Sequence, residues 1–134
     1  MKISFSGTRK GMSNIQKKIV THLLSIYKPD KVRHGDCIGA DNDFHNIAKD
    51  IGIDIILHPP INEKYRAFCD SKEILEAKDY LDRNRDMINS SELLLATPKD
   101  KEVLRSGTWM SIRYAISRKI PVWIIYPDGK INSR

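Results

Sequence analysis

The 134-residue chain has little cysteine and no long apolar run. Its two cysteines, Cys37 and Cys69, form no CxxC pair, so neither a disulfide scaffold nor a zinc site is expected. No stretch approaches the roughly 20 apolar residues that cross a bilayer. The N-terminal segment MKISFSGTRKG alternates apolar and polar residues and lacks the apolar core of a signal peptide. We therefore expect a reduced, cytoplasmic protein without membrane association, bound metal or cofactor.

Two familiar phosphate-binding motifs are also absent. The sequence contains neither GxxxxGK[ST] nor GxGxxG, which excludes a Walker loop and the usual dinucleotide fingerprint. Aromatic residues make up only 7% of the chain and do not alternate with the basic pairs, so a stacking surface for single-stranded nucleic acid is not indicated. The net charge of +6 nevertheless favours anionic partners.

Apolar periodicity predicts one α/β domain over residues 1–134. Alternating or continuous apolar residues predict five strands, at 2–6, 31–34, 53–58, 92–98 and 121–127. Helical spacing predicts a helix after each of the first four, while residues 61–79 are expected to be a loop leading into the third helix. Such alternation indicates a Rossmann-like, doubly wound, mainly parallel five-stranded sheet with helices on both faces. An order of 3-2-1-4-5 would place the chain reversal between strands one and four.

In an open α/β sheet, a ligand binds beyond the carboxyl ends of the strands, where the strand order reverses. After the first strand, Gly7 permits a tight turn, Thr8 offers a hydroxyl donor, and Arg9 can hold an anion with two hydrogen bonds. After the fourth strand, three residues begin a helix whose free amides favour an anion: Ser106, Gly107 and Thr108. The two loops together predict a phosphate site, although each alone also fits an ordinary turn.

The stretch RHGDCIGAD after the second strand concentrates reactive residue types. A metal site or a nucleophile pair is not favoured, because His34 lies on the strand, Cys37 in the turn, and no third ligand or orienting group is nearby. The glycines of this stretch, Gly35 and Gly39, fit a wide turn into a helix. Asp41 falls in the first helical turn, where a carboxylate suits the helix dipole.

Three further residues, Asp36, Asn84 and Arg85, each have two possible roles. Asp36 could accept hydrogen bonds from the sugar or base of a ligand, or stabilise its own turn. Asn84 shares the apolar stripe of its helix, whereas Arg83 and Arg85 are expected to diverge from it. Asn84 with a flanking arginine, Arg85, could therefore contact the ligand, or Asn84 could be a cap and the arginines solvated.

Four segments in this order resemble the SLOG superfamily: FSGTR, HGDCIGAD, RNRDMI and RSGTWMSIRYA. The superfamily includes DNA-processing A proteins, Lonely Guy proteins and small YpsA-like proteins of bacteria and phages. The resemblance covers about residues 2–126. It implies a Rossmann-like fold and a pocket for nucleotides or nucleotide-derived ligands. The binding positions that it implies are Gly7, Thr8, Arg9, Gly35, Asp36, Gly39, Ala40, Asp41, Ser106, Gly107 and Thr108.

One departure from the family bears on catalysis. The Lonely Guy hydrolases have a PGGxGTxxE motif whose Glu acts on the glycosidic bond, whereas Ser111 occupies that position here. A hydrolase of this type would need a carboxylate from another loop, such as Asp36 or Glu102. Whether the protein is an enzyme is therefore open.

Three functions follow from these features. The first is a sensor or sequestering module for a phosphorylated nucleotide, an ADP-ribose-like ligand or a signalling nucleotide. The second is a nucleoside-phosphate N-glycosidase or a deoxyribosyltransferase-like enzyme, with Asp36 or Glu102 as the catalytic carboxylate. The third, ranked last, is binding of single-stranded DNA, which would depend steeply on salt. A homo-oligomer is compatible with the family, but no interface stripe is evident.

Overall fold

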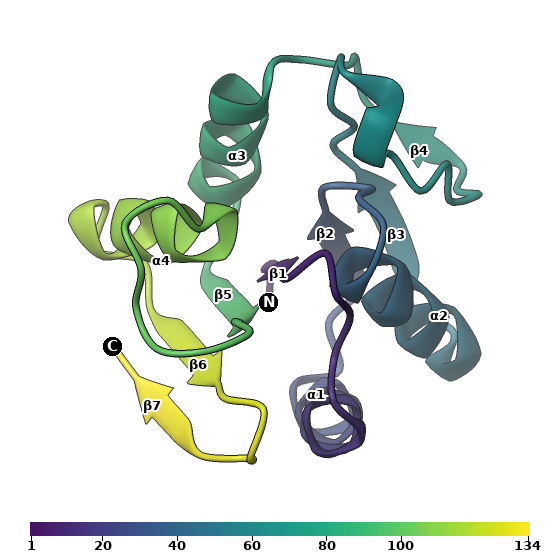
Figure 1. The fold of residues 1–134 in the computed structure, drawn as a ribbon. Coiled ribbons are helices and arrows are strands. Elements are labelled where there is room, and N and C mark those ends of the chain that lie inside the picture. The colour runs from purple at the N-terminus through teal and green to yellow at the C-terminus, as the bar shows by residue number, and fades with distance from the viewer.

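A seven-stranded sheet runs through the fold. Figure 1 shows how the strands and helices are arranged in the computed structural model. The structure describes residues 1–134. Its order is β4-β3-β2-β1-β5-β6-β7. Every neighbouring pair is parallel except β6 and β7. The strands are β1 (Ile3–Gly7), β2 (Lys31–His34), β3 (Asp54–Leu57), β4 (Glu73–Ile74), β5 (Leu93–Thr97), β6 (Val122–Ile125) and β7 (Ile131–Ser133).

The predicted Rossmann-like class and the central strand order are confirmed, but the predicted number of strands is wrong. The five expected strands are β1, β2, β3, β5 and β6, and they occur in the expected order. The additional strands, β4 and β7, lie at the two edges and consist of exposed residues. Backbone hydrogen bonds to β3 and β6 hold them, and exposed edge strands leave no apolar pattern in the sequence.

Local signals set the ends of the helices, which are α1 (Asn14–Tyr27), α2 (Ala40–Ile51), α3 (Tyr80–Asn89) and α4 (Gly107–Ser117). At the start of α1, Ser13 and Gln16 form a capping box. The third helix begins at Tyr80, later than its first apolar residue suggests, because the Asp79 side chain accepts the Asp82 N–H at 3.0 Å and caps it. The segment 61–79 contains a short 3-10 helix, η1 (Glu63–Tyr65).

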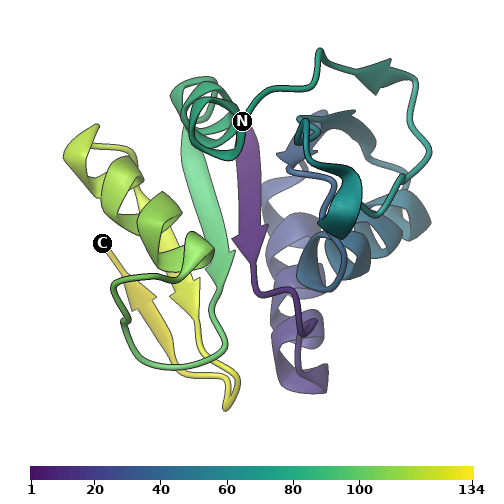
Figure 2. The ribbon, with the colours of Figure 1, turned by 45° about the horizontal axis from the view of Figure 1, so that its top comes forward.

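Helices cover both faces of the sheet, and Figure 2 shows β1 and β5 side by side between them. Successive residues of β5 point to opposite faces. Leu93 and Leu95 join the core cluster that contains residues of α1 and α2, whereas Leu94 and Ala96 pack with residues of α3 and α4. This alternation explains why β5 is a continuous apolar run, since both of its faces are buried.

None of the helices is long and apolar enough to span a membrane.

Candidate functional site

A cavity of about 1130 Å³ lies at the carboxyl edge of the sheet, where β1 is flanked by β2 on one side and β5 on the other. This is the reversal of strand order at which open α/β sheets bind ligands. Most of the predicted site residues line the cavity, namely Gly7, Thr8, Arg9, Gly35, Asp41, Asn84, Ser106, Gly107 and Thr108. The structure thus brings together three loops that are far apart in the sequence.

Gly39 and Ala40, also predicted as ligand contacts, support the first loop from behind and do not line the cavity. The Ala40 N–H donates to the Thr8 carbonyl at 2.9 Å. A Cβ added to Gly39 would lie 2.2 Å from the Arg9 carbonyl oxygen, so only glycine lets the two loops approach this closely. These two residues place Thr8 and Arg9 at the cavity.

The start of α4 forms one wall of the cavity. Ser106 is the N-cap and accepts the Trp109 N–H at 3.3 Å, while Gly107 and Thr108 open the helix. The remaining free amides and the helix dipole favour an anion at this wall. Trp109 is buried in the core, as expected, and its Nε1 donates to the Asp100 carbonyl at 3.3 Å.

The cavity is cationic. Its charged lining consists of Arg9, Lys10, Arg83, Lys99, Lys101 and Arg105, against Asp41, Asp79 and Asp100. None of the six cationic side chains forms an ion pair with a carboxylate. Lys10 and Lys99 both line the cavity, and Lys99 lowers the pKa of Lys10. Cations without a carboxylate partner make this part of the cavity favourable for an anion.

The arginine of α3 that reaches the cavity is Arg83, not Arg85. Only 3% of Arg83 is exposed, and its Nη1 donates to the carbonyls of Gly35 and His58, the latter at 3.0 Å. Its buried Nε has no hydrogen-bond partner in the protein. Arg85 is exposed, lies outside the cavity and stacks over Tyr114. The expectation that Arg83 diverges from the buried stripe is wrong, although Met87, four residues later, signals that stripe.

Asn84 is buried, as its position on the stripe predicts, and it connects the cavity to Ser111. Its Nδ2 donates to the Ser111 Oγ at 3.2 Å, and that hydroxyl donates to the Gly107 carbonyl at 3.2 Å. Ser111 does not line the cavity. At the position that corresponds to the catalytic Glu of the Lonely Guy hydrolases, this chain has a hydroxyl that braces the start of α4.

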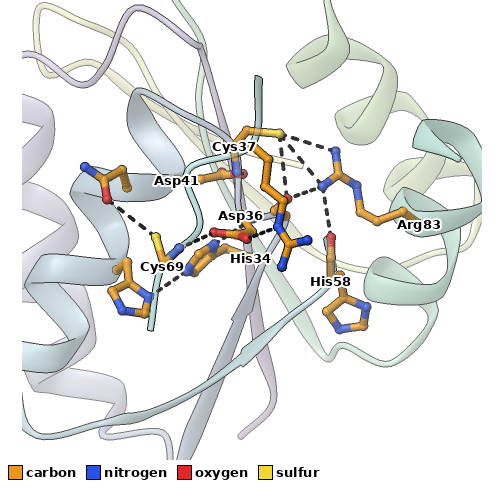
Figure 3. Close-up of polar contacts among 11 residues, drawn as sticks. His34, Asp36, Cys37, Asp41, His58, Cys69 and Arg83 are labelled. Atoms are coloured by element: carbon orange, nitrogen blue, oxygen red, sulfur yellow. Dashed lines mark hydrogen bonds and ion pairs between the residues drawn. The ribbon is translucent and has the colours of Figure 1, made fainter. Parts of the chain in front are cut away.

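Asp36 does not line the cavity, and its carboxylate is buried against another segment (Figure 3). Its Oδ2 accepts the Arg66 Nε–H and its Oδ1 accepts the Cys69 N–H, both at 2.9 Å. Its φ is +54°, a conformation that few residues other than glycine adopt. Asp36 thus anchors the segment after β3, and neither of the two roles expected for it includes this long-range contact.

Glu102, the other predicted catalytic carboxylate, is exposed and lies outside the cavity. Its Oε2 pairs with Arg113 Nη1 at 3.1 Å, and the same guanidinium donates to the Leu104 carbonyl at 2.9 Å. This ion pair holds the loop between β5 and α4 to the helix.

His34 has two potential soft ligands nearby, His45 and Cys69, which the sequence did not reveal. The hydrogen bonds do not suit a metal. The Asp36 N–H donates to His34 Nδ1 at 3.0 Å, so in the neutral ring Nε2 carries the proton and donates to His45 Nδ1 at 2.9 Å. A metal ligand normally uses one ring nitrogen and donates a proton from the other, which this N–H opposes. The cluster is a buried hydrogen-bonded chain, and burial lowers the pKa of both histidines.

Asp41 is the one buried carboxylate that lines the cavity. Its Oδ2 accepts the Cys37 N–H at 3.1 Å (Figure 3). Burial raises the pKa of Asp41 to about 6, against the opposing effect of the positive charge of Arg83. Near neutral pH a moderate change in pH therefore alters the charge of the cavity.

The raised pKa of Asp41 predicts a loss of stability as the pH rises from 3.8 to about 6, because the native state holds the proton more tightly than the unfolded chain. Relative to Asp41→Asn, the wild-type free energy of unfolding should fall by about 2 kcal/mol over this range. Urea denaturation at several pH values measures the difference. Asp50→Asn, an exposed position on the same helix, is the control and should follow the wild-type curve. Parallel curves for wild type and Asp41→Asn would contradict the assignment.

No protein-family model matches the chain, and no curated protein sequence matches it. Solved structures with a similar fold exist. A molybdenum cofactor binding protein from Rippkaea orientalis is 16% identical, with a TM-score of 0.70 over 93% of this chain and 76% of that one. The molybdenum cofactor carrier protein of Chlamydomonas reinhardtii is 19% identical, with a TM-score of 0.63 over 92% and 75%. The structural genomics target TM1055 is 15% identical, with a TM-score of 0.65 over 90% and 71%. These likenesses establish a shared fold, in agreement with the Rossmann-like architecture expected from the motifs.

Proposed function

We propose that this protein binds a phosphorylated small molecule, a nucleotide or a nucleotide-derived compound, and acts as a sensor or a sequestering module. The observation that carries the proposal is the cationic lining of the cavity, whose arginines and lysines form no ion pair with a carboxylate: Arg9, Lys10, Arg83, Lys99, Lys101 and Arg105. The nearby start of α4 adds free amides and the positive end of a helix dipole. A phosphate group would neutralise the positive charge of the lysines, and its oxygens would accept hydrogen bonds from those amides.

Two further observations support a polar ligand. The Arg83 side chain lines the cavity and forms no ion pair with a carboxylate, so its positive charge also favours an anion. In addition, two of the proteins with a similar fold are named for binding or carrying molybdenum cofactor, so this cofactor belongs among the ligands to be tested.

Isothermal titration calorimetry with pyrophosphate, ADP, ADP-ribose and molybdenum cofactor tests the proposal. Replacing both lysines, as Lys10→Ala with Lys99→Ala, should weaken binding of pyrophosphate by roughly tenfold or more, because the charge-assisted hydrogen bonds to the anion are lost. The matched control is Lys18→Ala with Lys72→Ala, which removes the same charge from exposed positions outside the cavity. Equal weakening by both double variants would attribute the effect to net charge, and no binding by the wild type at millimolar ligand would refute the proposal.

Asp36 and Glu102 lie outside the cavity, so we propose that the protein binds its ligand and does not hydrolyse it. A general acid or base must come within hydrogen-bond reach of the reacting group, and neither carboxylate lines the cavity. A polynucleotide is also less favoured, because the cations gather inside a cavity and do not form an extended groove for a backbone. Both alternatives remain open to direct test, by base release and by the salt dependence of single-strand affinity.

A further inference from the structure

We propose that the cavity has two ends of different chemistry, and that Arg9 and Tyr65 form a platform on which a planar heterocycle joined to the phosphate stacks. This inference rests on the proposed function and specifies its ligand: a compound with a flat nitrogen heterocycle at one end and phosphate at the other. A small inorganic anion alone would leave the platform unused.

The platform is a cation–π contact between two flat side chains at the cavity, with Lys64 Nζ a further 5.1 Å from the centre of the same ring. The Arg9 guanidinium carbon lies 3.9 Å from the centre of the Tyr65 ring, and both side chains line the cavity and are exposed. Aromatic rings and guanidinium planes are the surfaces on which proteins stack bases. Two exposed apolar side chains, Ile38 and Ile61, line the same end, and the Ile38 N–H donates to the Tyr65 carbonyl at 2.8 Å.

The two ends lie on opposite sides of β1. Tyr65 belongs to η1, which follows β3, whereas Lys99, Lys101 and Arg105 follow β5. Figure 2 shows η1 and the loop after β5 on either side of the carboxyl end of β1. Three strand intervals separate β3 from β5, which is about 14 Å at the usual spacing. The loop after β1 connects the two ends, because Arg9 lies against Tyr65 and Lys10, the next residue, lines the cavity together with Lys99.

Asp36 holds the platform in place, although it touches no part of the cavity. Its side chain binds Arg66 and Cys69, and its carbonyl accepts the Ala67 N–H at 2.8 Å. The residues just after Tyr65 are therefore fixed to the turn that follows β2. Such anchoring lowers the entropic cost of stacking, because the ring is positioned before the ligand arrives.

Titration calorimetry with ADP, GDP and pyrophosphate tests the platform. In Tyr65→Ala, the affinity for the tighter-binding nucleoside diphosphate should fall about tenfold, the effect of losing one stacking partner, while the affinity for pyrophosphate is unchanged. Tyr65→Phe keeps the ring and should keep the wild-type affinity. Phe68→Ala is the matched control: this ring lies in the same segment, is exposed and stacks under Arg66, but it lies outside the cavity.

The outcomes separate the platform from the proposed function. Selective loss of nucleotide affinity in Tyr65→Ala, with Phe68→Ala at the wild-type value, supports the platform. If wild-type protein binds pyrophosphate as tightly as both nucleotides, or if Tyr65→Ala weakens pyrophosphate equally or weakens nothing, the platform is overturned and the anion site stands. If wild-type protein binds none of the three, the proposed function fails and the platform fails with it.

Discussion

Gly39→Ala is expected to lower the free energy of unfolding by about 4 kcal/mol, the sum of backbone strain and a clash that cannot relax. Gly39 has φ +87° and ψ −123°, in a region that side chains other than hydrogen do not tolerate. The new Cβ would also lie 2.2 Å from the Arg9 carbonyl oxygen and 2.7 Å from its Cα. These are backbone atoms of the first cavity loop, so the clash cannot be relieved by rotating a side chain.

Gly52→Ala is the control for this variant, because Gly52 terminates the same helix and also has a positive φ. Its φ is +92° and ψ is 26°, in the left-handed helical region, and a Cβ there would meet no atom within 4 Å. Strain alone should cost about 1 kcal/mol. Urea denaturation followed by tryptophan fluorescence measures both variants. Equal losses of stability would show that close approach to Arg9 contributes nothing.

Arg83→Met is expected to lower the free energy of unfolding by about 4 kcal/mol, because it removes one partner from a buried polar network. The carbonyls of Gly35 and His58 lose the donor Nη1. The Asp41 carboxylate loses a positive charge that lowers its pKa, so a buried negative charge becomes less compensated. Denaturation with urea gives the change in stability.

Arg85→Met is the matched control for Arg83→Met, two residues along the same helix. Arg85 is exposed, and its removal should change stability by no more than about 0.5 kcal/mol. NMR titration supplies a second readout. The pKa of His58, about 4, is held low by burial and by the charges of Arg33 and Arg83, so it should rise in Arg83→Met and stay unchanged in Arg85→Met. Similar results for the two variants would contradict the buried role of Arg83.

Much of the fold could be predicted because the signals are local. Apolar periodicity located all four α-helices and the five central strands. The edge strands β4 and β7 escaped prediction, since their residues are exposed and their pairing comes from backbone atoms. Periodicity in the sequence reveals strands and helices with a buried face, but it does not reveal strands that form only through backbone hydrogen bonds to a neighbour.

The candidate site was predicted only in part. Glycines and hydroxyl residues at the ends of β1 and β5 indicated the edge of the sheet at which the cavity lies, and nine of the predicted positions line that cavity. No motif marks three of the cavity residues, so the sequence does not reveal Tyr65, Lys10 and Lys99. Arg83 could have been found, because it lies four residues before the buried Met87 on the same face of α3. The expectation that Arg83 diverges from the buried stripe treated a charged residue as solvated, whereas the fold surrounds Arg83 with carbonyl oxygens.

The sequence by itself determined the order of the helices and the five central strands and the edge of the sheet at which the cavity lies, because periodicity and parallel topology act over a few residues or through general rules. Only the tertiary structure decided what each polar residue does there. Asp36 meets Arg66 and Cys69, which lie 30 and 33 residues away in the sequence. The role of a charged side chain depends on the partner that neutralises it, and distant segments supply that partner only when the chain has folded.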